Sequence, residues 1–196
     1  MSLWDMRARW YDRARRLFPV RYVVTRELQN LEALLRQVPG TPRRSLDVGT
    51  GTGTVLERLP ANTLAIAADL SRGMLDQVKR KGYANLVQAH ATSLPFKPHV
   101  FELVTAVGVL EYQQEPLAFL QELHRVNTSG GRLVVTFSPL GALNLLRHLL
   151  LQRVHMMSVR RISQLLDAAG YRIEAMRKSL MQKQILARCT YVTKNT

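Results

Sequence analysis

A glycine-spaced turn near residue 50 is the part of the chain whose residue types and spacing could bind a ligand. Its glycines, Gly49, Gly51 and Gly53, lack the Cβ atoms that would keep the main chain away from a ligand, and they permit the positive φ angles of a tight strand-to-helix turn. Asp69 lies twenty residues after the first glycine, at the end of an apolar run over residues 64–68. A carboxylate there can accept hydrogen bonds from both hydroxyls of a ribose. The spacing therefore predicts a nucleoside-binding site.

The glycine spacing also separates two classes of ligand. A dinucleotide-binding turn has its third glycine two residues further on, where helix and strand pack around a pyrophosphate, whereas this chain reads Gly-x-Gly-x-Gly. Asp47 stands at the mouth of the turn, and its charge repels phosphate but attracts an ammonium group. A nucleoside that carries an amino acid therefore fits better than a nicotinamide dinucleotide.

Four short motifs resemble, in order and spacing, those of the class I S-adenosylmethionine-dependent methyltransferases, most closely the small enzymes that act on quinones, lipids and other small molecules. They are residues 46–53, Asp69-Leu70-Ser71 with Met74, residues 93–96 and residues 130–133. The resemblance implies an α/β, Rossmann-like, doubly wound fold with a mostly parallel seven-stranded sheet, an antiparallel C-terminal hairpin and N-terminal lid helices.

The resemblance also implies that S-adenosylmethionine is the cofactor and S-adenosylhomocysteine the product. Asp47 would accept a hydrogen bond from the cofactor's amino group, directly or through water, and Asp69 would hold the ribose. Gly108, after the fourth expected strand, would place a carbonyl near the same amino group. The expected cofactor-binding residues are Asp47, Gly49, Thr50, Gly51, Gly53, Asp69, Leu70, Met74, Ala91, Thr92, Gly108 and Tyr11.

Several of these positions concern the adenine and the lid. Leu70 and Met74 would line the adenine face. Ala91 and Thr92 would offer backbone contacts to the adenine edge. Tyr11 resembles the family's lid tyrosine, and its alternative role is helix packing.

Position 90 departs from the family, which commonly has an acidic residue there to accept a hydrogen bond from the adenine amine. A neutral imidazole nitrogen of His90 could accept that bond. The alternative is that His90 is structural or exposed and that the adenine relies on the backbone.

Glu111 and Tyr112 are the candidate catalytic residues, at a place where the family often has a histidine. Glu111 could deprotonate an acceptor hydroxyl or amine, and Tyr112 could orient it. Alternatively, Glu111 faces water and Tyr112 packs against the lid. His148 and His155 are acceptor-side candidates only. Methyl transfer is an in-line displacement that requires no metal, and no metal site is expected.

The chain reads as a single domain over residues 1–196, because its length suits one core and is too short for two. Strands that alternate with helices predict a parallel sheet covered on both faces, with ligands beyond the carboxyl ends of its strands. Residues 1–40 are expected to form the lid helices, residues 43–138 the cofactor-binding core, and residues 139–196 the acceptor-side helices and edge hairpin. Expected strands are 44–48, 64–68, 85–89, 103–107, 131–138, 171–179 and 185–193; expected helices are 3–18, 22–38, 54–59, 74–81, 116–126 and 158–169.

The net charge of +14 lies in the two flanks of the chain. Residues 1–44 hold ten arginines against four acids and residues 139–196 hold ten bases against two acids, whereas residues 45–138 are balanced. Such a field attracts nucleic acid, anionic lipid surfaces or acidic small molecules. The alternative is a merely solvated basic surface.

Residues 139–157 predict a basic amphipathic helix, with Leu143, Leu146, Leu150, Val154 and Met157 on one face. The run is too short and too charged to span a bilayer. It could lie on an anionic membrane surface or wall an apolar acceptor pocket, and its alternative role is packing on the sheet.

The absence of a long apolar run and of a secretory pattern leads us to expect a cytoplasmic protein. Cys189 is the only cysteine, which excludes an intrachain disulfide, and its place in an apolar stretch predicts an inert buried thiol.

The sequence favours methyl transfer to a small, apolar or amphiphilic acceptor such as a quinone, phenol or lipid precursor. One alternative is an RNA methyltransferase, which the basic flanks permit. Against it, residues 108–111 read Gly-Val-Leu-Glu where an Asn/Asp-Pro-Pro-aromatic motif would be expected. The other is a non-catalytic, cofactor-binding regulatory module. The expected partners are the acceptor and, peripherally, an anionic membrane surface; the oligomeric state is left open.

Overall fold

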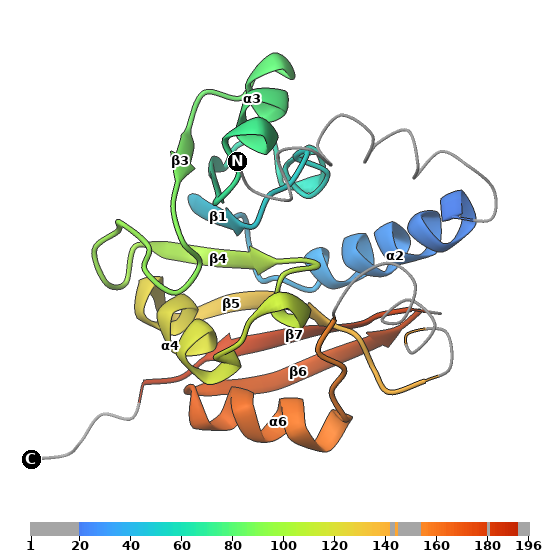
Figure 1. Cartoon of the computed structure of the whole chain (residues 1–196). Coiled ribbons are helices and arrows are strands. Elements are labelled where there is room, and N and C mark those ends of the chain that lie inside the picture. Colours follow the sequence, from blue (N-terminus) through green and yellow to red (C-terminus); the bar gives the residue numbers. More distant parts are fainter. Residues whose placement is uncertain (1–19, 142–143, 145–153, 180, 192–196) are drawn as a thin grey trace, which may run out of the picture.

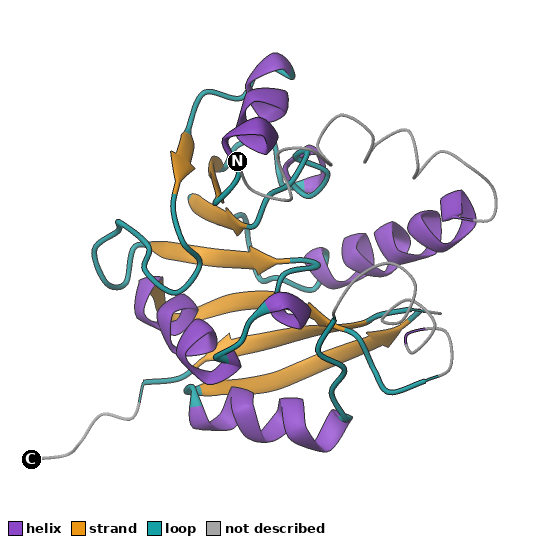
Figure 2. Cartoon of the chain, viewed as in Figure 1, coloured by secondary structure: helices purple, strands orange, loops and turns teal. Residues whose placement is uncertain are grey.

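The computed structural model describes residues 20–141, 144, 154–179 and 181–191, which form a sheet with helices on both faces (Figure 1, Figure 2). Its seven strands lie in the order β3-β2-β1-β4-β5-β7-β6. The first five run parallel, and β7 is antiparallel to both β5 and β6. The strands are β1 (Arg44–Val48), β2 (Leu64–Asp69), β3 (Leu86–Gln88), β4 (Phe101–Ala106), β5 (Asn127–Phe137), β6 (Tyr171–Lys178) and β7 (Lys183–Cys189). The predicted doubly wound, mostly parallel sheet with an antiparallel C-terminal hairpin is confirmed.

The described helices cover both faces of the sheet. They are α2 (Val20–Leu35), α3 (Arg72–Arg80), α4 (Pro116–Val126) and α6 (Val159–Ala168), with single 3-10 turns η1 (Leu56–Arg58) and η2 (Leu110–Tyr112). None of these described helices has the length and apolar character needed to cross a membrane. The predicted lid helix over residues 3–18 lies outside the described residues.

Alternation along the strands explains how one sheet builds two cores. Neighbouring residues of a strand point to opposite faces. On one face, Leu103, Val134 and Leu186 pack with Leu31 and Leu34 of α2. On the other face, the adjacent residues of the same strands pack with the apolar sides of α4 and α6. The continuous apolar runs of the central strands therefore reflect burial on both faces, as the sequence predicted.

The helix expected over residues 54–59 was wrong. The structure has only the 3-10 turn η1 there, closed by a 2.9 Å hydrogen bond from Arg58 N to Val55 O. Pro60 explains the difference, because the residue before a proline avoids helical geometry, and Leu59 has an extended ψ of 152°.

The helix expected over residues 139–157 was wrong at both ends. Residues 139–141 form a bridge and a bend. Residues 154–157 form no helix, and Met157 pairs with Pro139 in a parallel bridge. The Met157 amide donates to Ser138 O at 3.0 Å, so this segment pairs with the residues that directly follow β5. Val154 and Met157 are buried, as an apolar face should be, but in an extended segment. Of the rest of that expected helix, residues 142–143 and 145–153 lie outside the described residues.

Three local predictions in the C-terminal part of the chain are confirmed. Ser158 caps α6, because its hydroxyl accepts from Arg161 N at 3.1 Å, and Gly170 ends that region with a φ of +87°. Cys189 is a buried free thiol, and burial raises the pKa of this thiol to about 11, so it stays protonated and inert near neutral pH.

The turn after β1 is held against the end of β2. The amides of Gly49 and Thr50 both donate to Ala68 O, at 2.7 and 3.1 Å. Gly49 and Gly51 have φ angles of +65° and +54°. A Cβ on Gly49 would lie 2.3 Å from Val109 Cγ2, whereas a Cβ on Gly51 would meet no atom within 4 Å. The first glycine is therefore required for packing, and the second borders open space.

We expect Gly49→Ala to destabilise the protein more than Gly51→Ala. Both substitutions impose the strain of a left-handed conformation, but only Gly49→Ala must also displace Val109, which adds about 1–3 kcal/mol to the loss in free energy of unfolding. Chemical denaturation of the two variants measures the difference. Equal losses would show that Val109 moves without cost.

Candidate functional site

A pocket of about 740 Å³ opens beyond the carboxyl ends of β1, β2 and β4. Its walls come from α2, the glycine turn, the end of β2, the segments after β3 and β4, and the turn between β6 and β7. This is the place where ligands bind in open α/β sheets, and the volume suits a cofactor-sized molecule. The order of the strands therefore gathers residues from these segments, together with Met74 of α3, around one cavity.

Most of the predicted site residues line this pocket. Three predicted cofactor residues, Asp47, Gly53 and Thr92, do not line it, and Tyr11 lies outside the described residues. The predicted residues that do line it are Gly49, Thr50, Gly51, Asp69, Leu70, Met74, Ala91, Gly108, Glu111 and Tyr112.

Asp69 ties the glycine turn to the end of β2. Its Oδ2 accepts a hydrogen bond from the amide of Gly51 at 2.9 Å, and its Oδ1 accepts one from the amide of Ser71 at 2.8 Å. Each carboxylate oxygen has a second lone pair, so these bonds leave capacity for ligand hydroxyls. The sequence predicted only the ligand role; the structure adds that Asp69 shapes the turn.

Asp47 lies beneath the turn, on β1, with 1% of its surface exposed. Burial raises the pKa of this carboxyl to about 7, although the Thr105 hydroxyl, which donates to Oδ1 at 2.7 Å, and Thr50 oppose the shift. The group therefore titrates near neutral pH and can respond to a cation in the pocket above it.

His90 and Thr92 form a small hydrogen-bonded unit at the adenine side. His90 Nδ1 lies 2.8 Å from the Thr92 hydroxyl and accepts from the Thr92 amide at 3.4 Å. An amide can only donate, so a neutral ring carries its proton on Nε2 and presents a donor. His90, which lines the pocket, is then a poor replacement for a carboxylate that accepts from an amine, and the backbone alternative is favoured.

Gly53 and Gly108 act through packing and backbone geometry. A Cβ on Gly53 would lie 3.3 Å from Val78 of α3, so this glycine allows the turn to pack on that helix. Gly108 has a φ of +74°, and its amide donates to the Thr136 hydroxyl at 2.7 Å. This hydrogen bond fixes the segment after β4 that leads to Glu111.

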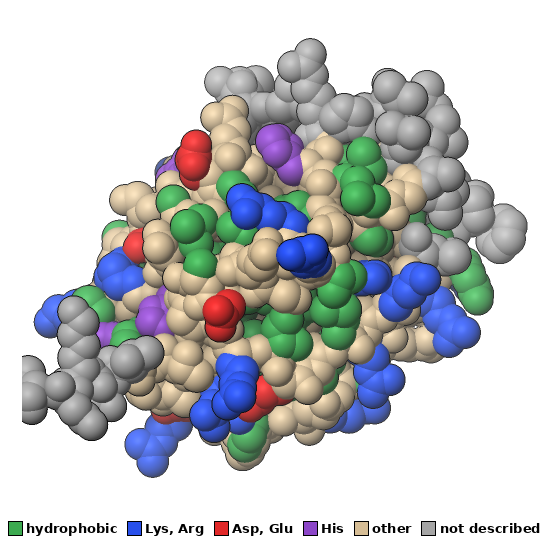
Figure 3. All heavy atoms as spheres, turned by 90° about the horizontal axis from the view of Figure 1, so that it is seen from below, with side chains coloured by type: hydrophobic (Ala, Val, Ile, Leu, Met, Phe, Trp, Pro, Cys, Tyr) green, Lys and Arg blue, Asp and Glu red, His purple; other side chains and the backbone are tan. Residues whose placement is uncertain are grey.

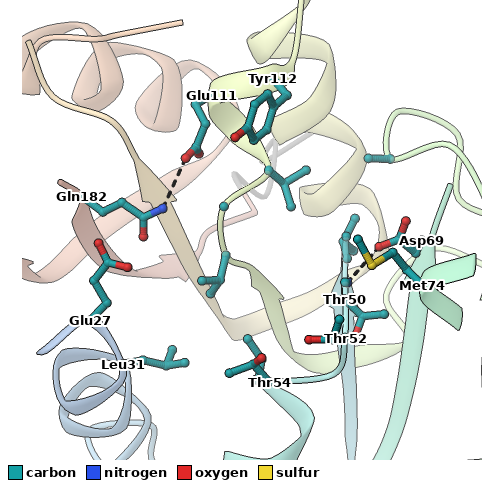
Figure 4. A pocket seen from close by; sticks show the side chains of 18 of the residues that line it. Glu27, Leu31, Thr50, Thr52, Thr54, Asp69, Met74, Glu111, Tyr112 and Gln182 are labelled. Carbon is teal, nitrogen blue, oxygen red and sulfur yellow. Dashed lines mark hydrogen bonds between the residues drawn. The ribbon is translucent and has the colours of Figure 1, made fainter. Parts of the chain in front are cut away.

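Glu111 is fully buried at the opposite end of the pocket, so the alternative in which it faces water is wrong (Figure 4). Its Oε1 accepts from Gln182 Nε2 at 3.3 Å and from the Ser138 hydroxyl at 3.4 Å. Tyr112, the next residue of η2, also lines the pocket. His155 is exposed; its amide donates to Glu111 O at 2.7 Å, and His148 lies outside the described residues.

The sequence analysis missed two polar residues at this end, Glu27 and Gln182. Glu27 projects from α2, and its Oε1 accepts from the Ser179 hydroxyl at 3.3 Å. Gln182 lies in the turn between β6 and β7. No signal in a single sequence marks either residue, because each reaches the pocket only through long-range packing.

Comparison with known proteins identifies the class. Residues 46–135 match the model of the methyltransferase domain family. A demethylmenaquinone methyltransferase from Clavibacter sepedonicus is 34% identical over 139 residues, which cover 68% of this chain and 56% of that protein. A demethylmenaquinone methyltransferase from Thermus thermophilus is 37% identical over 126 residues, covering 58% and 56%. The chain thus spans about half the length of the curated relatives it matches.

Solved structures show the same fold at low identity. A chain of the complex between the Haloferax volcanii Trm112 methyltransferase activator and a methyltransferase aligns with a TM-score of 0.80 and 13% identity, over 97% of this chain and 99% of that one. The Burkholderia thailandensis 1,6-didemethyltoxoflavin-N1-methyltransferase aligns with a TM-score of 0.72 and 18% identity, over 96% and 88%.

Residues 46–135 match the methyltransferase domain family, and the chain shares its fold with solved methyltransferase structures. The resemblance inferred from the four motifs is confirmed.

We expect the free energy of unfolding to record the titration of Asp47. The folded state holds this proton more tightly than the unfolded chain, whose pKa is near 3.8, so the carboxylate costs stability once ionised. Relative to Asp47→Asn, the wild-type protein should lose up to about 4 kcal/mol as the pH rises from about 4 to about 7, with no further change above that.

Denaturant titrations at several pH values measure this loss. Asp76→Asn, which removes an exposed carboxylate on α3, is the control. A difference between wild type and Asp47→Asn that does not depend on pH would contradict the assigned titration.

Proposed function

We propose that this protein transfers a methyl group from S-adenosylmethionine to a small, amphiphilic acceptor bound in the same pocket. The observation that carries the proposal is the pairing of Asp69 with the Gly51 amide beside open space at the carboxyl end of β2. It places an acceptor for ribose hydroxyls next to a stretch of main chain that no side chain covers. The matched methyltransferase domain family supports the same assignment.

The residues present fit S-adenosylmethionine. The open space beside Gly51 admits a ligand against the backbone, and Met74 and Leu70 offer apolar contact to an adenine ring. Asp47, whose Oδ2 is buried without a hydrogen bond, gives a negative potential beneath the turn when ionised. A bound sulfonium would supply the methyl group as an electrophile. The cation and the acid are then mutually stabilising.

The protein's own contribution to the reaction is mainly positioning. Holding two reactants in near-attack geometry, with water excluded, lowers the free-energy barrier by about 7–11 kcal/mol relative to a reaction in solution. The glycine turn and Asp69 would hold one reactant, and Tyr112 with the apolar side chains of α2 would hold the other. Glu111 would accept a proton from the acceptor's hydroxyl or amine. The roles of Glu111 and Tyr112 as catalytic residues stay predictions.

The acceptor end supports a small molecule with an apolar body. Val23, Leu28 and Leu31 of α2 form one wall, and Val107 and Val109 form part of the other. Relatives that are named for a demethylmenaquinone acceptor support an acceptor of this size and character. The division into lid, core and acceptor-side segments, the cytoplasmic location and contact with an anionic membrane also stay predictions.

We expect S-adenosylhomocysteine to raise the melting temperature and NADH to leave it unchanged, because the glycine spacing and the acid at the turn suit an amino-acid-bearing nucleoside.

Incubation with radiolabelled S-adenosylmethionine and a cell extract, followed by separation of lipid, small-molecule, protein and nucleic-acid fractions, then locates the acceptor. Label in the small-molecule or lipid fraction is the expected result. Label confined to RNA would overturn the acceptor class, and stabilisation by NADH alone would overturn the cofactor.

We expect Asp69→Ala to weaken binding of S-adenosylhomocysteine by about 1–3 kcal/mol, because it removes both the ribose acceptor and the anchor of the Gly51 amide. Asp69→Asn keeps one acceptor oxygen and should have a smaller effect. Isothermal titration calorimetry measures both dissociation constants. An unchanged constant in Asp69→Ala would remove Asp69 from the site.

A further inference from the structure

Three side chains that accept hydrogen bonds meet at the acceptor end of the pocket. Glu27 comes from α2, Glu111 from η2 and Gln182 from the turn between β6 and β7, and all three line the cavity. Figure 4 shows Gln182 between the two carboxylates, with its amide nitrogen toward Glu111. Segments far apart in the sequence thus bring two acids and an amide to one place.

The hydrogen bonds of Gln182 fix which end of its amide faces the cavity. Its side-chain nitrogen donates to Glu111 Oε1 at 3.3 Å, and a carboxylate can only accept, so Oε1 is the end left for a ligand. The residue is 9% exposed, and no described residue donates a hydrogen bond to this oxygen. This oxygen can therefore accept a hydrogen bond from a ligand or a water molecule in the cavity.

The main chain around Gln182 holds it in place. The backbone amide of Gln182 donates to the Ser179 hydroxyl at 3.1 Å, and its backbone carbonyl accepts from the Ser179 backbone amide at 2.9 Å. The same Ser179 hydroxyl lies 2.9 Å from Gln182 O and 3.3 Å from Glu27 Oε1, and its one proton is shared between these two acceptors. Hydrogen bonds through Ser179 therefore link the turn between β6 and β7, Gln182 and the carboxylate of Glu27.

The sign of the charge in the pocket is opposite to that of the chain. The described residues that line it include three carboxylates, those of Glu27, Asp69 and Glu111, and neither Lys nor Arg is among these residues. In contrast, Lys and Arg side chains are spread over the surface on the α6 side (Figure 3). Exposed bases on that side include Arg160, Arg161 and Arg172. Carboxylates that line a cavity favour a cation there.

We propose that the methyl acceptor presents a primary amine to Glu27, Gln182 and Glu111. This inference rests on the proposed function and names the chemistry of its acceptor. An ammonium group has three donors for three acceptors, whereas a hydroxyl has one and a bare carbonyl has none. Hydrogen bonds between an ammonium group and a carboxylate are about twice as strong as neutral ones. The apolar side chains of Val23, Leu28 and Met181 bind the body of the molecule.

Three probes with similar skeletons test the inference: 2-phenylethylamine, 2-phenylethanol and 3-phenylpropanoate. Each is titrated calorimetrically into the full-length protein saturated with S-adenosylhomocysteine, at neutral pH. The amine should bind about tenfold more tightly than the alcohol, and the carboxylate should bind most weakly because it meets like charge. An amine that binds no more tightly than the alcohol, including an amine that does not bind, overturns the inference.

Two variants identify the residues responsible. Glu27→Gln removes a charge and Gln182→Leu removes the amide oxygen, and each should reduce the preference for the amine at least several-fold. Glu115→Gln removes an exposed carboxylate that does not line the pocket and should leave the preference unchanged. A preference that survives in both Glu27→Gln and Gln182→Leu overturns the assignment of the amine site.

The binding of S-adenosylhomocysteine separates this test from that of the proposed function. If the wild-type protein does not bind S-adenosylhomocysteine, the proposed function fails. If S-adenosylhomocysteine binds but the amine has no advantage over the alcohol, only the acceptor chemistry fails. The dissociation constant of S-adenosylhomocysteine in each variant also shows whether the cofactor side of the pocket is intact.

Discussion

The site depends on one carboxylate that accepts hydrogen bonds from two main-chain amides. Asp69, at the last position of β2, binds the amides of Gly51 and Ser71 and so joins the turn after β1 to the start of α3. Without this link, the turn would be held only at its start, by the hydrogen bonds from Gly49 and Thr50 to Ala68 O, and Gly51 would regain conformational freedom. The register of β1 with β2 places the acid there, since the pairing brings Val48 opposite Ala68. The register of β1 with β2 thus sets the shape of the glycine turn.

The carboxylates in the pocket and beneath it differ because their surroundings differ. Asp69 is stabilised by backbone donors, whereas Asp47 is buried under the turn, where burial raises its pKa to about 7. Glu111 is buried among the hydroxyl of Ser138 and the amide of Gln182. Buried acids in a cavity are expensive unless a ligand of opposite charge shares it. The architecture therefore favours a cavity filled by molecules that carry positive charge.

Much of the cofactor side could be predicted from the sequence, because it is built from local signals. The spacing from Gly49 to Asp69 and the apolar runs of the strands predicted a mostly parallel sheet with a ligand site beyond the carboxyl ends of its strands. Two helix predictions failed because of residues outside the helical pattern. Pro60 prevented a helix over residues 54–59, and Met157 paired with the segment after β5. Glu27 and Gln182 could not be found, because their position follows from packing between distant segments. Glu111 was found by its place after β4, although its full burial was not expected.

The acceptor end is made by contacts between the two ends of the described chain. Gln184 Nε2 donates to Glu27 O at 2.8 Å across 157 residues, and the Ser179 hydroxyl reaches Glu27 across 152. A ribosome that adds residues from the N-terminus completes the strands β1 to β4 long before β7. The glycine turn and Asp69 are thus synthesised early, whereas the end of the pocket that Gln182 lines is completed only with the last strand. Substitutions in the turn between β6 and β7 therefore change one end of the pocket and leave the residues of the other end in place.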